Sequence, residues 1–506
     1  METVQSVEGA NAASAGNKSH YYLSKSLYIK GLQCRKALYL EKFRSELKGE
    51  ISSEMQASFD SGNMVGEAAQ DLFPGGVLVP YIENNIPEQL RLTDEAMKNG
   101  TNAIYEASFQ YDGIFVKVDI LHRGDEGWEI YEVKGGTQLK PVYVDDASLQ
   151  YHVLAGAGVN ISKVFISYIN NEYVRGKDLN VHKLFICEDI TGQIKEKQSC
   201  VTEELKEQRQ MLGGKIPEIS IGPHCFDPYD CDFHDHCWQH IPEDSVFDLR
   251  GRGVDKYALY AQGIVYQTDI LVDSLNKKQS LQVTATLRQQ DTVDKEKVKE
   301  FLETLSYPLY FLDFETFMSA IPMYEGVRPY QKVPFQYSLH FQKEKEGELY
   351  HKEFLAEPGI DPRKPLLEKL LSDIPEDVCI LAYNMAFEKS VLTELADQYP
   401  EHAETIEKWK TNMRDLIIPF RQRDVYFWRF KGSYSIKTVL PVLVPELSYE
   451  GLKIADGGAA MNAYHEMCAS INNPETLEQI RQNLLDYCKL DTLAMVQILD
   501  VLGRLV

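Results

Sequence analysis

The sequence predicts an α/β protein built from several domains, and three observations lead to this fold class. The chain has 506 residues, which corresponds to about three domains of roughly 150 residues each. Its composition, 44% hydrophobic and 25% charged, is typical of globular proteins and excludes collagen-like or wholly disordered chains. Two long parts, residues 21–245 and 301–506, alternate short strand patterns with helical patterns.

The charge balance limits how the chain can bind other molecules. Lys and Arg total 53 against 76 Asp and Glu, so the net charge is −23. A polyanion such as nucleic acid must therefore bind at local basic patches rather than through bulk charge. No apolar run approaches the ~18 residues that a membrane span requires, and we expect a cytoplasmic protein without a membrane anchor.

Four segments follow one another along the chain. Residues 1–20 are polar and rich in small residues, so we expect a disordered tail. Residues 21–245 end in a cysteine-rich stretch and form the first domain. Residues 246–300 are helical and charged, which predicts a small helical connector. Residues 301–506 open with an apolar strand and close with a long amphipathic helix, which predicts a second α/β domain.

A candidate metal site lies in the run IFVKVDILHRGDEGWEIYEVKGG, which reads as a β-hairpin around a Gly-containing turn. A turn centred between Asp125 and Glu126 places Asp119 opposite Glu132. Lys134 lies two residues beyond Glu132 and therefore shares its face of the sheet. Two carboxylates at 4 Å repel by roughly 4 kcal/mol unless a cation lies between them. Oxygen ligands suit Mg²⁺ or Mn²⁺, and a lysine beside such an ion suits phosphodiester hydrolysis. The alternative is an ordinary solvated hairpin face.

These residues resemble the PD-(D/E)xK nuclease superfamily, specifically its RecB-like branch, which includes CRISPR-associated four-cysteine nucleases. The resemblance covers about residues 21–240 and implies a restriction-endonuclease-like domain. GNMVGEAAQ is similar to the helix that contributes a ligand to the metal site, which makes Glu67 the candidate, although Gly66 occupies another plausible ligand position. DDASLQYHVLAG is similar to the helix whose Gln lies beside the catalytic lysine, which makes Gln150 the candidate.

A second group of candidate ligands consists of cysteines. Cys225, Cys231 and Cys237 recur every six residues, and Cys34 lies near the start of the same domain. Four thiolates can hold either Zn²⁺ or an iron–sulfur cluster. Zinc sites usually use closely spaced cysteine pairs, so the wider spacing favours a [4Fe–4S] cluster. The resemblance implies the same cluster, with a structural role that joins the two ends of the domain. The alternatives are Zn²⁺ with help from a nearby histidine, or free buried cysteines; the histidines in question are His224, His234, His236 and His240. The remaining cysteines show no ligand spacing and are expected to serve packing: Cys187, Cys200, Cys379, Cys468 and Cys488.

A third group of candidates lies in the second domain. In YPLYFLDFETF an apolar strand ends in Asp313 and Glu315, whose side chains project from one face. In LLDYCKLDTLAMVQIL a helix carries Tyr487 and Asp491 four residues apart, on one side. Either pair alone is usually ordinary surface. Together, with YNMAFEKSVLTELA between them, they resemble DnaQ-like exonucleases of the RNase H fold.

The resemblance covers about residues 307–500 and implies 3′–5′ exonuclease chemistry. Four acidic residues hold two metal ions in this family, and in its tyrosine subgroup a Tyr orients the attacking water. Asp313, Glu315, Asp491 and Tyr487 match that pattern. The family's second motif normally ends in Phe-Asp, whereas this chain has Glu388 at that position. The longer side chain puts the metal geometry in question.

Two basic segments offer paths for a nucleic-acid strand. Residues 421–437 carry five Lys or Arg against one Asp, interleaved with aromatic residues. Basic groups can follow phosphates while aromatic rings stack on bases, although the same aromatics could equally be core. Residues 21–50 carry seven Lys or Arg against three Glu. The connector resembles helical hairpins that contact nucleic-acid backbones, but we expect a spacer that makes no contact with nucleic acid.

The sequence therefore predicts a metal-dependent nuclease with two active sites, acting on DNA in preference to RNA. One alternative is that only one domain is catalytic and the other binds nucleic acid. An RNA-directed exonuclease is a second. A third is a non-catalytic scaffold whose carboxylates are ordinary surface charge.

Overall fold

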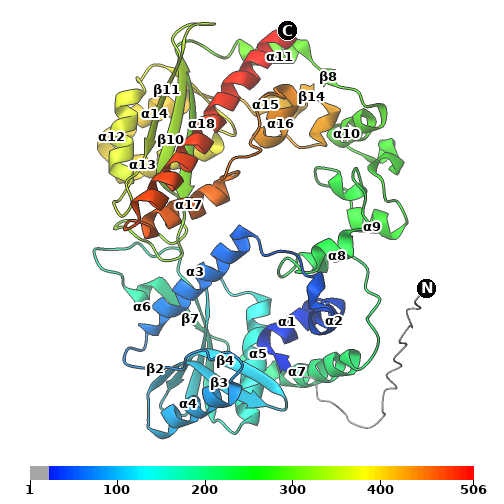
Figure 1. Cartoon of the computed structure of the whole chain (residues 1–506), viewed down its shortest axis with the longest axis vertical. Helices are drawn as coiled ribbons and strands as arrows, with labels where there is room; N and C mark the ends of the chain where they lie inside the picture. The colour runs from blue at the N-terminus through cyan, green and yellow to red at the C-terminus, as the bar shows by residue number, and fades with distance from the viewer. Residues whose placement is uncertain (1–21) are drawn as a thin grey trace, which may run out of the picture.

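Two mixed β-sheets organise the chain, one in the N-terminal half (residues 22–245) and one in the C-terminal half (residues 301–506), with the connector (residues 246–300) along one side (Figure 1). The computed structural model describes residues 22–506, apart from the side chains of Ser53 and Glu54. The predicted tail lies outside the described residues. The α/β class with several units agrees with the prediction. No helix of the described chain is long and apolar enough to cross a membrane.

The N-terminal sheet has the strand order β2-β3-β4-β5-β6-β7, with β1 paired to β4. Strands β3–β5 are antiparallel, β5 runs parallel to β6 through the crossover helix α5, and β7 pairs antiparallel with β6. The strands are β1 (Leu23–Ser24), β2 (Val77–Leu78), β3 (Ala103–Tyr111), β4 (Ile114–Arg123), β5 (Trp128–Lys134), β6 (Ile161–Ile169) and β7 (Phe185–Asp189). The helices are α1 (Lys25–Gln33), α2 (Arg35–Phe43), α3 (Ser53–Gln70), α4 (Ile86–Lys98), α5 (Pro141–Gly156), α6 (Val181–Leu184), α7 (Thr191–Leu212) and α8 (His234–Trp238).

Helices cover both faces of this sheet. On one face, α1, α4, α5 and α7 pack on an aliphatic core. On the other face, Val65 and Ala69 of α3 pack beside Tyr105 and Tyr131, and Ala320 from the C-terminal half joins them. The two halves therefore share part of one core.

The hairpin formed by β4 and β5 has the predicted register. Ile120 pairs with Tyr131 and Leu121 with Ile130, so the residues of each pair sum to 251, as do Asp119 and Glu132. The backbone N–H of Val133 donates to Oδ2 of Asp119 at 2.7 Å. The prediction that Asp119 lies beside Glu132 is confirmed.

The C-terminal sheet has the order β11-β10-β9-β12-β13, with β9–β11 antiparallel and β12 and β13 parallel to β9. Its strands are β9 (Leu309–Phe317), β10 (Val333–Gln342), β11 (Leu349–Leu355), β12 (Cys379–Ala382) and β13 (Met413–Asp415). Strand β14 (Val425–Tyr426) belongs to a separate two-stranded sheet. The helices are α12 (Arg363–Asp373), α13 (Ala386–Gln398), α14 (Ala403–Asn412), α15 (Ile418–Gln422), α16 (Ile436–Leu443), α17 (Gly457–Ala469) and α18 (Pro474–Leu505).

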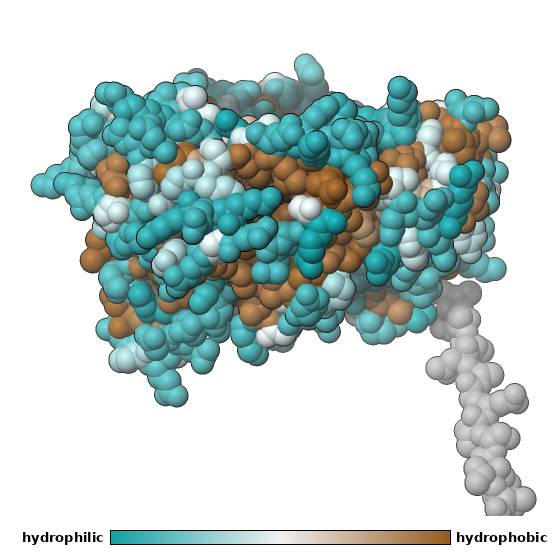
Figure 2. Space-filling view, turned by 90° about the horizontal axis from the view of Figure 1, so that it is seen from above, coloured by the Kyte–Doolittle hydropathy of each residue, from teal (hydrophilic) through white to brown (hydrophobic). Residues whose placement is uncertain are grey.

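Alternation along β9 separates two cores. Leu309 and Phe311 face a core that contains α16 and α18. Tyr310, Leu312 and Phe314 face a second core against α12–α14. Because side chains alternate, Asp313 and Glu315 lie on the face that α18 covers. Figure 2 shows the end of the molecule that lies at the top of Figure 1, in the C-terminal half. Hydrophilic side chains cover most of its surface, and apolar ones gather in a band across the middle.

The connector, which the sequence predicts to be helical, packs against the C-terminal half. It contains α9 (Lys256–Ala261), α10 (Lys277–Arg288), β8 (Thr292–Val293) and α11 (Lys295–Leu302). β8 pairs with β14, and Nζ of Lys278 donates to the carbonyl of Arg421 at 2.8 Å. Ala285 and Val298 are buried in the core of the C-terminal half, and this apolar burial fixes the connector in place.

Candidate functional site

The N-terminal site is a buried network of carboxylates and lysines on the face of the sheet that α1 and α5 cover. Nζ of Lys134 lies 2.5 Å from Oε1 of Glu132 and 2.6 Å from Oδ2 of Asp146. Nζ of Lys25, in the first turn of α1, lies 2.8 Å from the same Glu132 oxygen. Nε2 of Gln150 donates to Oε2 of Glu132 at 2.6 Å. The network thus joins β5, α1 and α5.

The acidic groups of this network differ in the direction of their pKa shifts, because nearby ammonium groups offset burial for one of them and not for the others. Burial alone would raise the pKa of Glu132, but the ammonium groups of Lys134 and Lys25 lower it below its ordinary value. Burial, together with the nearby Glu132, raises the pKa of Asp119 to about 8. Burial and Glu132 also raise the pKa of Asp146. Asp119 is therefore the carboxylate least compensated by a cation.

Sequence reasoning missed Lys25 and Asp146. Asp146 lies four residues before Gln150, on the same face of α5, so the helical repeat could have identified it. Lys25 follows the N-cap of α1 and is brought to the site only by tertiary packing.

The structure places Glu67 away from this network. Glu67 is exposed on α3, because Val65 and Ala69 on either side of it face the core and turn it outward. Among the described residues, Glu67 makes no contact with the network. Glu106, on β3, has a φ of 57°, forms an ion pair with Lys117 and raises the pKa of Asp119. A strained carboxylate beside Asp119 is a further candidate that the sequence did not indicate.

A cavity of about 700 Å³ opens beside the N-terminal site. It includes Lys25 and Asp146 in its lining, together with Lys30 of α1. Aromatic rings also line it, namely Phe59, Phe226 and Tyr229. Cations, aromatic rings and one end of the carboxylate network therefore share one solvent-accessible space.

The four predicted cysteines surround one small cavity. Cys34 lies between α1 and α2, Cys225 ends a short 3₁₀ helix and Cys237 lies in α8. Together with Cys231 they line the cavity, and Cys34, Cys231 and Cys237 pack against the cluster that contains Phe233. Burial raises the pKa of Cys231 to about 11, and the other three thiols add to that rise. Cysteines that are 203 positions apart in the chain, Cys34 and Cys237, are thus neighbours.

The C-terminal site gathers acidic groups from one strand and two helices. Asp313 and Glu315 lie on β9, Asp491 on α18 and Glu388 in the first turn of α13. Burial raises the pKa of Asp313 well above its ordinary value, and Asp491, Glu315 and Glu388 raise it further. Burial and Asp491 act in the same direction on Glu315. The other three predicted acidic residues thus lie close enough to Asp313 to affect its pKa.

β9 continues past these two acidic residues, so the prediction that they lie at a strand end is wrong. Asp313 pairs with Ser338 and Glu315 with Gln336 of β10, and pairing extends to Phe317. The antiparallel partner prolongs the strand beyond the apolar run that the sequence shows. The carboxylates therefore lie within the sheet, under α18.

Two tyrosines hold Asp491. Oη of Tyr449 donates to Oδ1 of Asp491 at 2.5 Å. Tyr487 is a second hydrogen-bonding partner of Asp491, and both hydroxyls counter the effect of burial, which raises the pKa of Asp491 to about 6. Nζ of Lys437 lies 5.5 Å from the centre of the Tyr487 ring and 5.7 Å from that of Tyr449. Sequence reasoning missed Tyr449 and Lys437 as members of this site.

Cys488 belongs to this site rather than only to the packing that the sequence predicts for it. Its Sγ lies 3.7 Å from Oδ2 of Asp313. Ligand atoms of Asp313, Glu315 and Cys488 all lie within 4.8 Å of one another. This is the one such group of three potential ligands within residues 22–506.

Glu388 is almost fully buried, with 2% of its surface exposed. Burial raises its pKa to about 8, with a further contribution from Asp415. Asp415 accepts hydrogen bonds from the backbone N–H groups of Asn384 and Ile417. It therefore positions the turn that leads into α13, a role that the sequence did not indicate.

A basic cavity of about 640 Å³ lies between the connector and residues 421–437. Four cations line it, and no carboxylate does; the cations are Arg250, Lys278, Arg421 and Arg423. Nε and Nη1 of Arg423 are buried and have no hydrogen-bond partner among the described residues. Tyr383 and Asn384, which precede Glu388, form its other wall. Within the predicted segment, Tyr426 and Phe430 are core, whereas Tyr434 is exposed at this cavity.

Comparisons with known proteins cover parts of the chain. Residues 310–435 match the family described as "Domain of unknown function (DUF2779)". "Uncharacterized protein MG366" of Mycoplasma genitalium is 25% identical over 219 residues, which is 40% of this chain and 33% of that protein. "Uncharacterized protein UU173" of Ureaplasma parvum is 25% identical over 230 residues, 41% of this chain and 32% of that protein. The chain spans about a third of the length of the curated relatives that it matches. No solved structure matches the chain. Residues 310–435, which include Asp313, Glu315 and Glu388, are thus similar to a domain found in other proteins.

Proposed function

We propose that the chain is a metal-dependent nuclease with two active sites, one RecB-like and one DnaQ-like, that hydrolyses phosphodiester bonds of DNA. The carrying observation is the C-terminal cluster of four acidic residues: Asp313, Glu315, Glu388 and Asp491. Burying several carboxylates without cations is costly, and hard divalent ions relieve that cost.

The donor set fits Mg²⁺ or Mn²⁺ at both sites. In the C-terminal site Asp313 and Glu315 would supply oxygens with Cys488 beside them, and Glu388 and Asp491 would add further oxygens. In the N-terminal site Asp119 and Glu132 supply oxygens. A bound divalent ion supplies an acidified water and stabilises negative charge on phosphate oxygens.

The protein's own groups supply positioning and charge. Tyr449 and Tyr487 hydrogen-bond Asp491 and hold it in one orientation, and in this proposal the Tyr487 hydroxyl orients the attacking water. Lys437 offers a positive charge beside the C-terminal cluster. In the N-terminal site Lys134 remains protonated, because the nearby Glu132 and Asp146 raise its pKa against the effect of burial. A protonated lysine can stabilise charge that develops on a phosphate.

The basic cavity supports an anionic substrate for the C-terminal site. It adjoins the turn before Glu388 and holds four cations in a chain whose net charge is −23. Unpartnered buried guanidinium N–H groups favour a phosphate as their partner. A single strand that enters here meets phosphate-binding groups first and the acidic cluster next.

We further propose that the four cysteines hold a [4Fe–4S] cluster rather than Zn²⁺. Zinc–sulfur bonds of about 2.3 Å place tetrahedral sulfurs only about 3.8 Å apart. Among residues 22–506, no three of these thiols come within 4.8 Å of one another, although all four line one cavity. This spacing suits a group larger than a single ion. Its role would be structural, because it joins α1 and α2 to residues 225–237.

The test separates the two sites. Wild type, Asp313→Asn and Lys134→Ala would be purified without oxygen and assayed on end-labelled single- and double-stranded DNA and RNA with Mn²⁺. Each substitution should remove one set of products and leave the other. Asp500→Asn, exposed on α18, and Lys163→Ala, exposed on β6, are the matched controls. Hydrolysis that survives both substitutions together would contradict the proposal.

A second candidate is a protein in which only the C-terminal site is catalytic. The favouring observation is that Lys25 and Lys134 already occupy the space between Glu132 and Asp146. In that case Lys134→Ala would change the affinity for DNA and leave the hydrolysis rate unchanged.

A further inference from the structure

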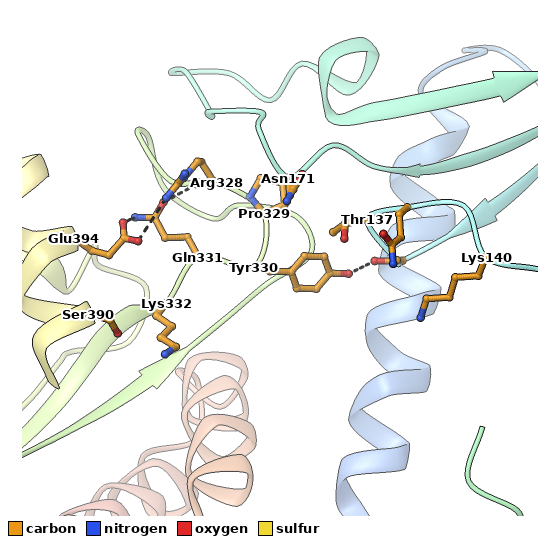
Figure 3. A pocket seen from close by; sticks show the side chains of 13 residues that line it. Thr137, Lys140, Asn171, Arg328, Pro329, Tyr330, Gln331, Lys332, Ser390 and Glu394 are labelled. Carbon is orange, nitrogen blue, oxygen red and sulfur yellow. Dashed lines mark hydrogen bonds and ion pairs between the residues drawn. The ribbon is translucent and has the colours of Figure 1, made fainter. Parts of the chain in front are cut away.

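A cavity of about 740 Å³ lies between the two halves of the molecule. The N-terminal half contributes the turn after β5 and the start of α5, and the C-terminal half contributes the segment before β10 and part of α13 (Figure 3). Tyr330 crosses from one half to the other, and its hydroxyl donates to the carbonyl of Gly135. The cavity is therefore a built feature of the contact between the halves.

One end of this cavity adjoins the N-terminal site. Gly135 and Gly136, which line it, directly follow Lys134. Nζ of Lys134 lies 5.4 Å from the ring centre of Tyr143, and Nζ of Lys140, in the cavity lining, lies 5.9 Å from the same ring. A single aromatic ring thus separates the lysine of the site from the lysine of the cavity.

The other end adjoins the C-terminal site. Nζ of Lys332 lies 4.3 Å from the ring centre of Phe387. The same ammonium counteracts the rise in the pKa of the next residue, Glu388. Ser390 of α13 also lines the cavity. The space therefore runs from the edge of one acidic site to the edge of the other.

Its lining favours an anion. Lys140, Arg328 and Lys332 line it against one carboxylate, that of Glu394, which is 3.4 Å from Arg328. Figure 3 shows Lys332 and Lys140 on opposite sides of the Tyr330 ring, one from each half. Cations beside an aromatic ring are the arrangement that grips single-stranded nucleic acid.

We propose that this cavity holds a segment of single-stranded nucleic acid that spans the two active sites. The inference rests on the proposed function and adds to it a continuous path, so that one strand occupies both sites at once. Lys140 and Arg328 contact its phosphates, and the Tyr330 ring lies against a base.

Binding to oligonucleotides of two lengths tests the path. Labelled oligothymidylates of about 6 nucleotides, which fit within one site, and of about 30 nucleotides would be titrated with the full chain, using Ca²⁺ to prevent hydrolysis. Lys140→Glu/Arg328→Glu should weaken binding of the longer strand by about tenfold or more and leave the shorter one unchanged. The slope of log affinity against log salt for the longer strand should decrease in magnitude by about 1.4, because each lost phosphate contact contributes about 0.7.

Two controls keep the outcomes distinct. Lys345→Glu, at an exposed position in the turn between β10 and β11, repeats the charge change away from the cavity and should bind both strands as the wild type does. Thermal unfolding of each variant checks that it is folded. Equal affinity of wild type and the double variant for the longer strand overturns the path and leaves the proposed function standing. A wild type that neither binds nor cleaves either strand overturns the proposed function itself.

Discussion

Replacing Glu388 by Gln should stabilise the metal-free protein while it disables the C-terminal site. The carboxylate is 2% exposed, and its Oε2 has no hydrogen-bond partner among the described residues. Burial raises its pKa from 4.5 to about 8. A buried acid that resists ionisation lowers the free energy of unfolding wherever the pH forces it to ionise.

The size and pH range of the effect follow from that pKa. The rise from 4.5 to about 8 corresponds to at most about 5 kcal/mol, at about 1.4 kcal/mol per pKa unit. The folded protein holds the proton more tightly than the unfolded chain, so the penalty is absent below about pH 4.5 and complete above about pH 8. For a unit of about 200 residues, 5 kcal/mol corresponds to an increase in Tm of roughly 10–20 °C.

Thermal unfolding in EDTA between pH 5 and 8.5 measures this effect. Glu388→Gln should unfold at a higher temperature than wild type at pH 8, and the difference should shrink as the pH falls. Adding Mn²⁺ should stabilise wild type more than the variant, because the variant loses a ligand. Asp397→Asn, at an exposed position on the same helix, is the control and should show neither effect. A Glu388→Gln protein that is no more stable than wild type at pH 8 would refute the reasoning.

Four further predictions concern the other groups of the two sites. Because burial and Glu132 raise the pKa of Asp119 to about 8, Mn²⁺ affinity at the N-terminal site, measured calorimetrically in an Asp313→Asn background, should rise between pH 6 and 8.5; a flat profile would contradict this. Lys134→Ala should lower the free energy of unfolding by about 3–5 kcal/mol in denaturant titrations, because the buried carboxylates of Glu132 and Asp146 lose one of their two ammonium partners. Cys488→Ala should weaken Cd²⁺ binding about tenfold or more while changing Mn²⁺ binding by less than twofold, since thiolates select soft metals; equal losses for both ions would show that the thiol is not a ligand. Cys231→Ser should abolish bound iron and its visible absorption and lower stability by at least about 2.7 kcal/mol, the linkage value for a ligand at 100 times its Kd, and unchanged iron content would exclude the cluster.

Local patterns predicted the pieces of each site better than their assembly. Period-two alternation and one short turn were enough to place Asp119 beside Glu132, because a hairpin's register depends only on its turn. Helical spacing likewise put Tyr487 and Asp491 on one side of α18. These relations involve neighbours along the chain.

Groups that come from distant segments could not be predicted in this way. Lys25 reaches Glu132 across 107 positions, and Tyr449 reaches Asp491 across 42. Neither has a spacing that a sequence pattern could reveal. Glu67 is the reverse case, a residue that the sequence predicts for the site and that the structure leaves exposed. The motif identifies the helix, but it does not determine which side of the helix faces the sheet.

The joining of Cys34 to residues 225–237 has a consequence for synthesis of the chain. The ribosome adds about 5–20 residues per second, so roughly 10–40 s separate the appearance of Cys34 from that of Cys237, 203 positions later. During this interval the first two helices lack the partners that enclose their thiol. The cluster that we propose therefore requires translation of the whole N-terminal half before all four thiols can hold it, and a nascent chain arrested before Cys225 would contain Cys34 without the other three.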